Sequence, residues 1–194
     1  GTGNTTGVLN TAIGSRAMRV NVTGSSNTAL GNEALTLNTT GSENTALGVS
    51  ALTANSTGTQ NVAVGKDALY NSDGNRNTAV GYKSLYANTN GSENTALGYK
   101  SLSSITNEPY NVAIGAYSLE NKVNGDRNVA IGASALNSMT LGGSNVAVGD
   151  GAGGAGHFKS GTTAIGAASN AIGSNSTAIG SGAIATATNT IQLG

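Results

Sequence analysis

Glu33 and Asp67 are the acidic residues whose spacing comes closest to that of a catalytic carboxylate pair. They lie two periods apart in a 17-residue repeat that runs through the chain. With one coil per period and coils stacked about 4.8 Å apart, their separation is about 10 Å, and glycosidases need about 5–10 Å. Glu43 and Glu93 share another column at about 14 Å. We expect the nine acidic residues to be solvated surface charges, and the chain not to be an enzyme.

His157 is the only histidine, and it lies beside the only phenylalanine, Phe158, in a glycine-rich stretch. A typical zinc site needs several His or Cys ligands, and the chain has no Cys. The stretch near Asp150 lacks the Lys-Ser/Thr of a phosphate-binding loop and the nonapeptide of calcium-binding rolls. We therefore predict no metal and no cofactor, and interpret residues 153–162 as a junction loop.

Tyrosine and lysine recur at matching positions in the middle of the chain. Tyr82-Lys83 and Tyr99-Lys100 occupy the same positions in successive periods and should stack into a strip. Aromatic rings beside polar donors suit contacts with carbohydrate or protein. The possible receptor contacts are Tyr70, Tyr82, Lys83, Tyr86, Tyr99, Lys100 and Tyr117. The alternative is an aromatic ladder between coils that only stabilises the rod.

Charges in neighbouring periods can also meet. Arg76 and Glu93 fall in one column of adjacent periods. We predict an ion pair between them, which contributes at most about 1 kcal/mol when exposed.

These side chains are positioned by a repeat whose core is Asn-(Thr/Val)-Ala-(Leu/Ile/Val)-Gly. Its closing glycines are Gly14, Gly31, Gly48, Gly65, Gly81, Gly98, Gly115, Gly132, Gly149 and Gly166. All but one of the intervals between them equal the 17-residue period, and the exception is shorter by a single residue. A fixed short period indicates stacked structural units, and this length suits one turn of a solenoid. We predict an all-β parallel β-solenoid with 17-residue coils over residues 1–152, about 50 Å long for ten coils.

Each column of the repeat has an expected place. Thr/Val-Ala-Leu predicts one strand per coil, with the Thr/Val and aliphatic residues on one face and Ala on the other. We expect the Thr/Val face to pack inside the coil and the Ala face to meet another chain. The pair Ala34-Leu35 after the core glycine fits a corner, a single helical turn or a strand. A second glycine, such as Gly24 or Gly41, is expected to supply the positive φ of a sharp corner.

Asparagine precedes the closing glycine by four residues in nine of the ten units. Stacked coil upon coil, these amides can form a ladder that satisfies the backbone groups of a corner. We predict this structural role for Asn27, Asn44, Asn61, Asn77, Asn94, Asn111, Asn128 and Asn145.

Composition restricts the partners. Net charge is zero, which gives no electrostatic basis for binding nucleic acid or an anionic membrane. No run approaches the roughly 18–20 apolar residues of a membrane span, so we expect no direct membrane insertion. Each coil has one branched aliphatic, one Leu and several Ala, so it can bury little apolar area. Ordering the backbone costs about 1–2 kcal/mol per residue, and the burial within a single chain barely offsets that cost. We therefore predict a homotrimer in which the Ala faces pack together.

The period changes after Gly166, where Ala-Ile-Gly recurs every seven residues at Gly173 and Gly180. This segment, residues 163–194, resembles the head repeats of YadA-like trimeric autotransporter adhesins, and the 17-residue units resemble an expanded form of the same repeat. The resemblance implies a left-handed parallel β-roll, three chains side by side and a surface-exposed binding role. It also implies that Ala187–Gly194 leads toward a neck, a stalk or a chaperone module.

The leading functional hypothesis is therefore an adhesive fibre head that attaches to a host surface protein, matrix or glycan. We expect an extracellular or cell-surface location, with an outer-membrane anchor in a missing C-terminal region. The alternative is a tail fibre of a phage or contractile injection system, on the particle itself. A second alternative is an ice-binding β-solenoid with a ladder of Thr. Interruption of that ladder by Val62, Val112, Val129 and Val146 favours a packed inner face instead.

Overall fold

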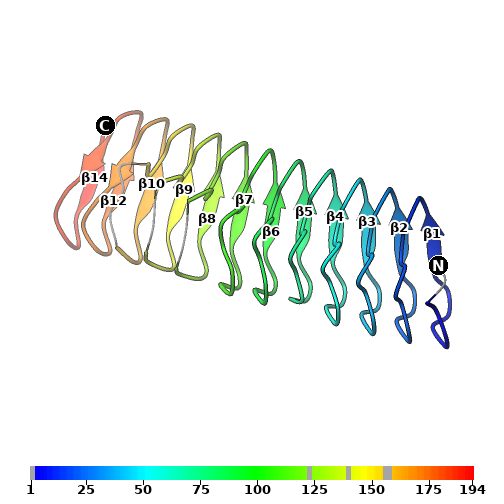
Figure 1. Ribbon diagram of the computed structural model, residues 1–194. Helices are drawn as coiled ribbons and strands as arrows, with labels where there is room; N and C mark the ends of the chain where they lie inside the picture. The colour runs from blue at the N-terminus through cyan, green and yellow to red at the C-terminus, as the bar shows by residue number, and fades with distance from the viewer. Residues whose placement is uncertain (1–2, 122–123, 139–140, 155–158) are drawn as a thin grey trace.

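The chain forms a rod of stacked coils, each with one short strand in its wall (Figure 1). The computed structural model describes residues 3–121, 124–138, 141–154 and 159–194. Those residues form strands and turns and no helix. The two ends of the chain lie at opposite ends of the rod (Figure 1). The predicted all-β parallel solenoid with 17-residue coils is confirmed.

The strands form a 12-stranded parallel sheet, in chain order from β1 to β10 and then β12 and β14, and a two-stranded sheet of β11 and β13. Their bounds are β1 Thr11–Ile13, β2 Thr28–Leu30, β3 Thr45–Leu47, β4 Val62–Val64, β5 Thr78–Val80, β6 Thr95–Leu97, β7 Val112–Ile114, β8 Val129–Ile131, β9 Val146–Val148, β10 Thr163–Ile165, β11 Asn170–Ala171, β12 Thr177–Ile179, β13 Ile184–Ala185 and β14 Ile191–Leu193.

Strand register follows the repeat even through the one shortened coil. Val62 of β4 pairs with Thr78 of β5, so the missing residue is lost from a turn and not from a strand. At that turn the Asp73 carboxylate accepts hydrogen bonds from the backbone N–H groups of Ser56 and Thr57, at 2.5 and 2.9 Å. In the preceding coil the equivalent N–H groups donate to a backbone carbonyl, that of Ser56. A side chain thus replaces the acceptor that the shortened coil lacks.

The strand faces are the reverse of those predicted. The strand alanines are completely buried inside the coil, as at Ala46, Ala96 and Ala113. The branched aliphatic residues point outward, and Leu30 and Leu97 are 47% and 46% exposed. The interior has room only for a methyl group on this wall, because the leucine of each following turn already belongs to the same core. The expectation of an outer Ala face between chains was therefore wrong.

The undecided Ala-Leu element is a turn. Ala34 and Leu35 are both fully buried, and the Leu35 N–H donates to the Ala51 carbonyl of the next coil at 3.0 Å. Leu35 has a left-handed backbone with φ of 50°, which costs about 1–2 kcal/mol for a residue other than glycine. Burial of a leucine side chain contributes about 1.5–3 kcal/mol and offsets this strain. The same conformation recurs at Leu52, Leu69, Leu85, Leu102, Leu119 and Leu136.

The second glycine of the repeat does not have the role that we predicted in most coils. At Gly24, Gly41, Gly58, Gly74 and Gly91 φ lies outside the left-handed region, and the left-handed corner residue comes two positions later, as at Ser26 with φ of 59°. Glycine is required there by contact between coils instead, because a Cβ at Gly24 would lie 2.2 Å from the carbonyl oxygen of Gly41. In later coils Gly125 and Gly142 do have positive φ values, of 124° and 106°.

The coils shorten toward the C-terminus. Thr163 of β10 pairs with Thr177 of β12, fourteen residues later, and Asn170 of β11 pairs with Ile184 of β13. Each coil there has strands on two walls, which explains the seven-residue recurrence of Ala-Ile-Gly. Residues 155–158 of the predicted junction loop, including His157 and Phe158, lie outside the described residues.

Enlarging an inner alanine should destabilise the rod. We expect Ala113→Leu to lower the free energy of unfolding by about 1–3 kcal/mol, because the added atoms overpack the narrow interior. Ala133, an exposed residue, provides the matched control, and Ala133→Leu should change stability by less than about 0.5 kcal/mol. Urea unfolding measures both, and equal losses would contradict the inward placement of the strand alanines.

Candidate functional site

The tyrosine–lysine edge comprises the seven residues Tyr70, Tyr82, Lys83, Tyr86, Tyr99, Lys100 and Tyr117. They lie in the turns that follow β4, β5, β6 and β7. The structure brings all seven together, because consecutive turns stack in the same register as the strands.

The rings form two columns that run along the rod. Tyr82 and Tyr99 stack with centroids 5.3 Å apart and an interplanar angle of 23°, and Tyr117 meets the Tyr99 ring edge-on at 5.1 Å. In the second column Tyr70 and Tyr86 stack at 5.4 Å. Such aromatic pairs contribute about 0.5–1.5 kcal/mol beyond their burial, so the columns stabilise the stack of coils.

Two lysines connect the tyrosine rings of this edge. The Lys83 ammonium lies 5.4 Å from the ring centroid of Tyr82 and 5.0 Å from that of Tyr86, so it joins the two columns. The Lys100 ammonium lies 5.7 Å from the Tyr99 ring and 5.9 Å from the Tyr117 ring. All of these distances are within the range of cation–π attraction.

Lys83 keeps its positive charge at neutral pH. Hydrogen bonding with the Tyr82 side chain, followed by its electrostatic influence, raises the pKa of Lys83 above its ordinary value of 10.5, and Tyr86 and Asp67 add smaller electrostatic contributions. A raised pKa favours the protonated form. Lys100 instead forms an ion pair with Glu120, whose carboxylate lies 3.6 Å from its ammonium.

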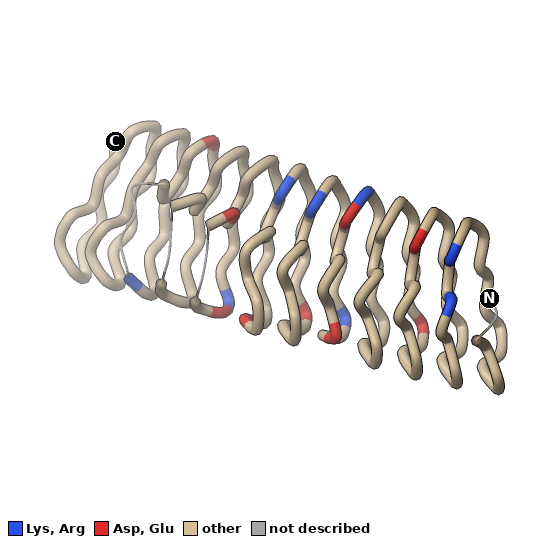
Figure 2. Tube along the Cα trace, viewed as in Figure 1, with Lys and Arg blue, Asp and Glu red and all other residues tan. Residues whose placement is uncertain are grey.

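Most charged residues lie along the two edges at which the coils turn (Figure 2). The predicted ion pair between Arg76 and Glu93 is confirmed at 2.6 Å. On the same edge Arg127 pairs with Asp126 and lies 5.3 Å from the ring of Tyr110. The strands of the described residues, β1 to β14, contain no Lys, Arg, Asp or Glu.

Two of the acidic residues singled out in the sequence have partners in neighbouring coils. Glu33 pairs with Arg16 at 2.6 Å rather than with Asp67, and Glu43 accepts a hydrogen bond from the Gln60 amide at 3.0 Å. Among the described residues no group of three or more His, Cys, Asp or Glu side chains could hold a metal ion. In the same part of the chain no helix is long and apolar enough to cross a membrane.

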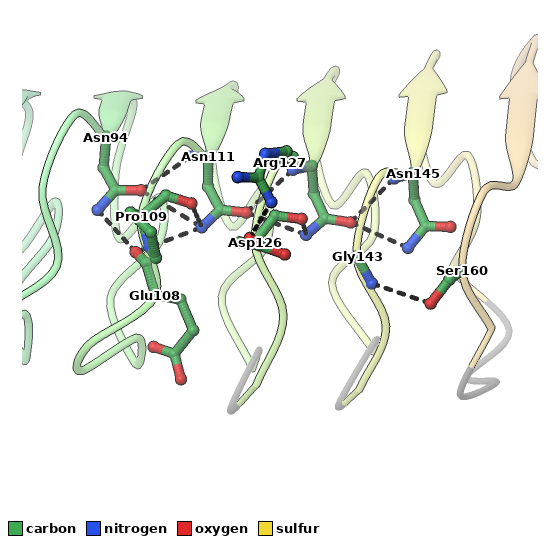
Figure 3. A network of polar contacts seen from close by, with 10 residues as sticks. Asn94, Glu108, Pro109, Asn111, Asp126, Arg127, Gly143, Asn145 and Ser160 are labelled. Carbon is green, nitrogen blue, oxygen red and sulfur yellow. Dashed lines mark hydrogen bonds and ion pairs between the residues drawn. The ribbon is translucent and has the colours of Figure 1, made fainter.

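The predicted asparagines lie one above another at the corner before each strand (Figure 3). The Asn27 side-chain oxygen accepts from the Asn44 backbone N–H at 3.0 Å, and its amide nitrogen donates to the Gly41 carbonyl at 2.8 Å. Asn27 and Asn44 are fully buried, so these bonds satisfy backbone groups that water cannot reach. The column therefore has a structural role, because each amide forms hydrogen bonds that join its coil to the next.

Sequence reasoning missed a second buried column formed by Asn21, Asn38 and Asn55. The Asn38 amide donates to the Asn21 side-chain oxygen at 2.6 Å, and the Asn55 amide donates to that of Asn38 at 2.8 Å. Ser72 and Ile105 occupy the same position in later coils. The signal was Asn at the 17-residue spacing three residues before the second glycine, but it is interrupted.

The interruptions leave two buried side-chain oxygens without a hydrogen-bond partner in the described part of the chain, those of Asn55 and Asn88. Asn55 precedes Ser72 in the column and Asn88 precedes Ile105. Each is the last asparagine before a residue whose side chain has no amide N–H to donate.

A hollow of about 260 Å³ lies at the first coil, lined by Asn4, Asn10, Ala12, Met18 and Asn21. These are the columns that pack on the neighbouring coil elsewhere in the rod. The hollow is therefore the interior of the coil, seen at the end of the rod.

Comparison with known proteins gives no independent identification. No model of a protein family matches the chain, and no curated protein matches it.

Removal of one rung of the asparagine ladder should be costly. Asn61 accepts from the Asn77 N–H at 2.9 Å and donates to the Gly74 carbonyl at 2.8 Å. Asn61→Ala leaves both groups buried and unpaired, at about 1–3 kcal/mol each, and we expect the urea midpoint to fall accordingly. Asn32→Ala is the control, because Asn32 is exposed and should tolerate the change within about 0.5 kcal/mol. An unchanged midpoint for Asn61→Ala would contradict the role of the ladder.

Proposed function

We propose that this chain is the rod-shaped head of a homotrimeric surface fibre that attaches to a host cell, matrix or glycan by multivalent contacts. The observation that carries the proposal is a column of branched aliphatic side chains on the outer face of the main sheet. We further propose that this face joins the copies and that the tyrosine–lysine edge contacts the receptor.

Branched aliphatic side chains project from this face at regular intervals. The exposed fractions are 59% for Ile13, 47% for Leu30, 46% for Leu97, 38% for Ile131 and 39% for Ile165. The same column continues into the 14-residue coils at Ile179. A monomeric soluble protein rarely exposes a contiguous apolar patch larger than a few hundred Å². A continuous column of this kind is typical of a surface that is covered by a partner.

The partner that fits best is another copy of the same chain. The face is uncharged, because the described strands contain no charged residue, so identical copies meet without repulsion. The aliphatic column repeats with the coil spacing, so parallel copies present matching side chains along their full length. Association would remove the face from water at about 25 cal/mol per Å² of apolar area. The trimer thus uses the face opposite to the one that we predicted from the sequence.

The adhesive role follows from what remains exposed in such an assembly. The two charged edges lie at the turns (Figure 2), away from the sheet face. Three copies display three tyrosine–lysine edges on one rigid particle, and linked weak sites can raise the overall affinity by about 10²–10⁴. A tail fibre of a phage or injection system would use the same assembly, and the flanking sequence separates the two: a membrane anchor indicates an adhesin, and a chaperone module indicates a tail fibre.

Ice binding is the second candidate, and one observation favours it. The Thr/Val column points out of the coil, not inward as we expected, and Val62 is 37% exposed. Thr11, Thr28, Thr45, Thr78, Thr95 and Thr163 share that face. A Thr column can contact ice only if it points out of the coil, as this one does. Thermal hysteresis by the purified chain would support this function, and its absence would exclude it.

Charge on the sheet face should dissociate the trimer. We expect wild-type protein to scatter light as three chains, and the double variant Leu97→Asp/Ile131→Asp to scatter as one, because buried unpaired carboxylates are strongly disfavoured. Ala133→Asp adds a carboxylate at an exposed turn position and should leave the trimer intact. A wild-type protein that is monomeric at all concentrations would overturn the assembly.

Adhesion should depend on that assembly. We expect wild-type protein to adhere to host cells or to surfaces coated with matrix proteins or glycans, and the monomeric double variant to adhere about 10²–10⁴-fold more weakly. Equal adhesion by trimer and monomer would contradict a multivalent mechanism. No adhesion to any of these surfaces would contradict the proposed function.

A further inference from the structure

The geometry points to an acidic polysaccharide, one that carries sulfate or carboxylate groups, as the ligand of the tyrosine–lysine edge, with Lys83 as its principal cation. This inference rests on the proposed adhesive function, because it names the class of receptor for that same surface. The argument depends on which atoms of the edge remain available to a ligand.

Stacking covers one face of each of four rings in the edge. Tyr82 and Tyr99 lie face to face at 5.3 Å, as do Tyr70 and Tyr86 at 5.4 Å, so each ring covers one face of its neighbour. A neutral sugar that binds an aromatic side chain mainly by apolar contact needs an open ring face. Lys83 lies over the rings of Tyr82 and Tyr86 as well, so the columns present fewer open faces together with phenol hydroxyls, which are hydrogen-bond donors and acceptors.

The lysine side chains add donors that carry full charge. Lys83 is held between the rings of Tyr82 and Tyr86, at 5.4 and 5.0 Å from their centroids. Within the described part of the chain it forms no ion pair with a carboxylate, and neither does Lys66 in the preceding turn. An ammonium that is positioned by aromatic rings but lacks an ion-paired carboxylate is suited to an anion from a ligand, since charge-assisted hydrogen bonds are the strong ones.

The cations lie in neighbouring coils of the rod. Lys66, Lys83 and Lys100 belong to three consecutive turns, and the turns repeat at about 4.8 Å. A linear polymer with regularly spaced acidic groups can meet them in order, with Tyr82 and Tyr99 next to Lys83 and Lys100 in the same turns. The edge has a directional row of donors, which suits an extended chain better than a single small anion.

Lys83 and Lys100 are not equivalent. Glu120 lies 3.6 Å from the Lys100 ammonium, and a ligand anion must compete with it. Lys83 forms no such ion pair with any described residue. The structure therefore predicts an order of importance: loss of Lys83 weakens binding more than loss of Lys100, and loss of Glu120 strengthens it.

The test uses the full chain and defined polymers. Binding of immobilised protein to dextran sulfate, polygalacturonate, neutral dextran and polyglutamate is measured at about 0.05 M and about 0.5 M salt. We expect binding to one or both acidic polysaccharides, strong weakening at high salt and no binding to neutral dextran. Dextran sulfate and polygalacturonate distinguish sulfate from carboxylate as the recognised group. Equal binding to neutral dextran, or a preference for polyglutamate over both acidic polysaccharides, would overturn the inference.

Variants then locate the site. Lys83→Gln should weaken binding about tenfold or more, as expected for loss of one charge-assisted hydrogen bond, and Lys100→Gln should weaken it less. Glu120→Gln should strengthen binding about two- to fivefold, the range of a surface ion pair. Lys159→Gln removes the same charge from an exposed position outside the edge and is the matched control. Equal effects of Lys83→Gln and Lys159→Gln would show attraction by overall charge and overturn the assignment to this edge.

The same variants separate this inference from the proposed function. If wild-type protein adheres to cells or coated surfaces and Lys83→Gln adheres equally well, the adhesive function stands and the acidic-polysaccharide site fails. If wild-type protein adheres to none of those surfaces but binds the acidic polymers through Lys83, the site stands and the adhesive function fails. Circular dichroism and urea midpoints of each variant verify that the rod remains folded.

Discussion

The structure depends on the requirement that each coil place the same kind of side chain directly over that of the coil before it. Backbone hydrogen bonds between coils fix this register, as in the pairing of Ala46 with Ala63. Within that register a buried amide can bond to the next coil, as Asn27 does to Asn44. A methyl group, an amide or a leucine is therefore repeated wherever the interior has room for only that group. A substitution at one position of a column therefore changes contacts with the neighbouring coil as well as within its own coil.

The narrow interior also decides what the outside presents. Because the strand alanine fills the inner wall, the Thr/Val and Leu/Ile/Val residues on either side of it must face outward, where Leu97 is 46% exposed. The inner side of each strand is therefore packed with alanine methyl groups, and the larger apolar side chains of the strand lie on the outside, where a neighbour can contact them. The proposed trimer is the interpretation in which this displayed face is covered, while the turns remain accessible.

Variation is concentrated where the stacking constraint is weakest. The turn after each strand accepts Tyr, Lys, Glu or Ala at equivalent positions, as at Lys83, Tyr117 and Ala168, because these side chains point away from the core. The tyrosine–lysine edge thus occupies a few consecutive turns of an otherwise uniform rod. The residues of this edge could be predicted because they recur at the same positions of the repeat. The contacts of Lys83 with two tyrosine columns and of Lys100 with Glu120 join different positions of the repeat, so they depend on side-chain directions in space.

By itself the sequence determined the period, the position of each strand in the 17-residue coils, the asparagine column and the Arg76–Glu93 pair, since residues one period apart must stack. Only the tertiary structure decided which side of the strand is inside. A three-residue strand such as Thr95–Leu97 alternates too briefly to distinguish a packed face from an outer one. The leucine of the following turn, which shares the core with the strand alanine, decides it. The close contact at Gly24 and the second asparagine column likewise depend on how neighbouring coils stack in space.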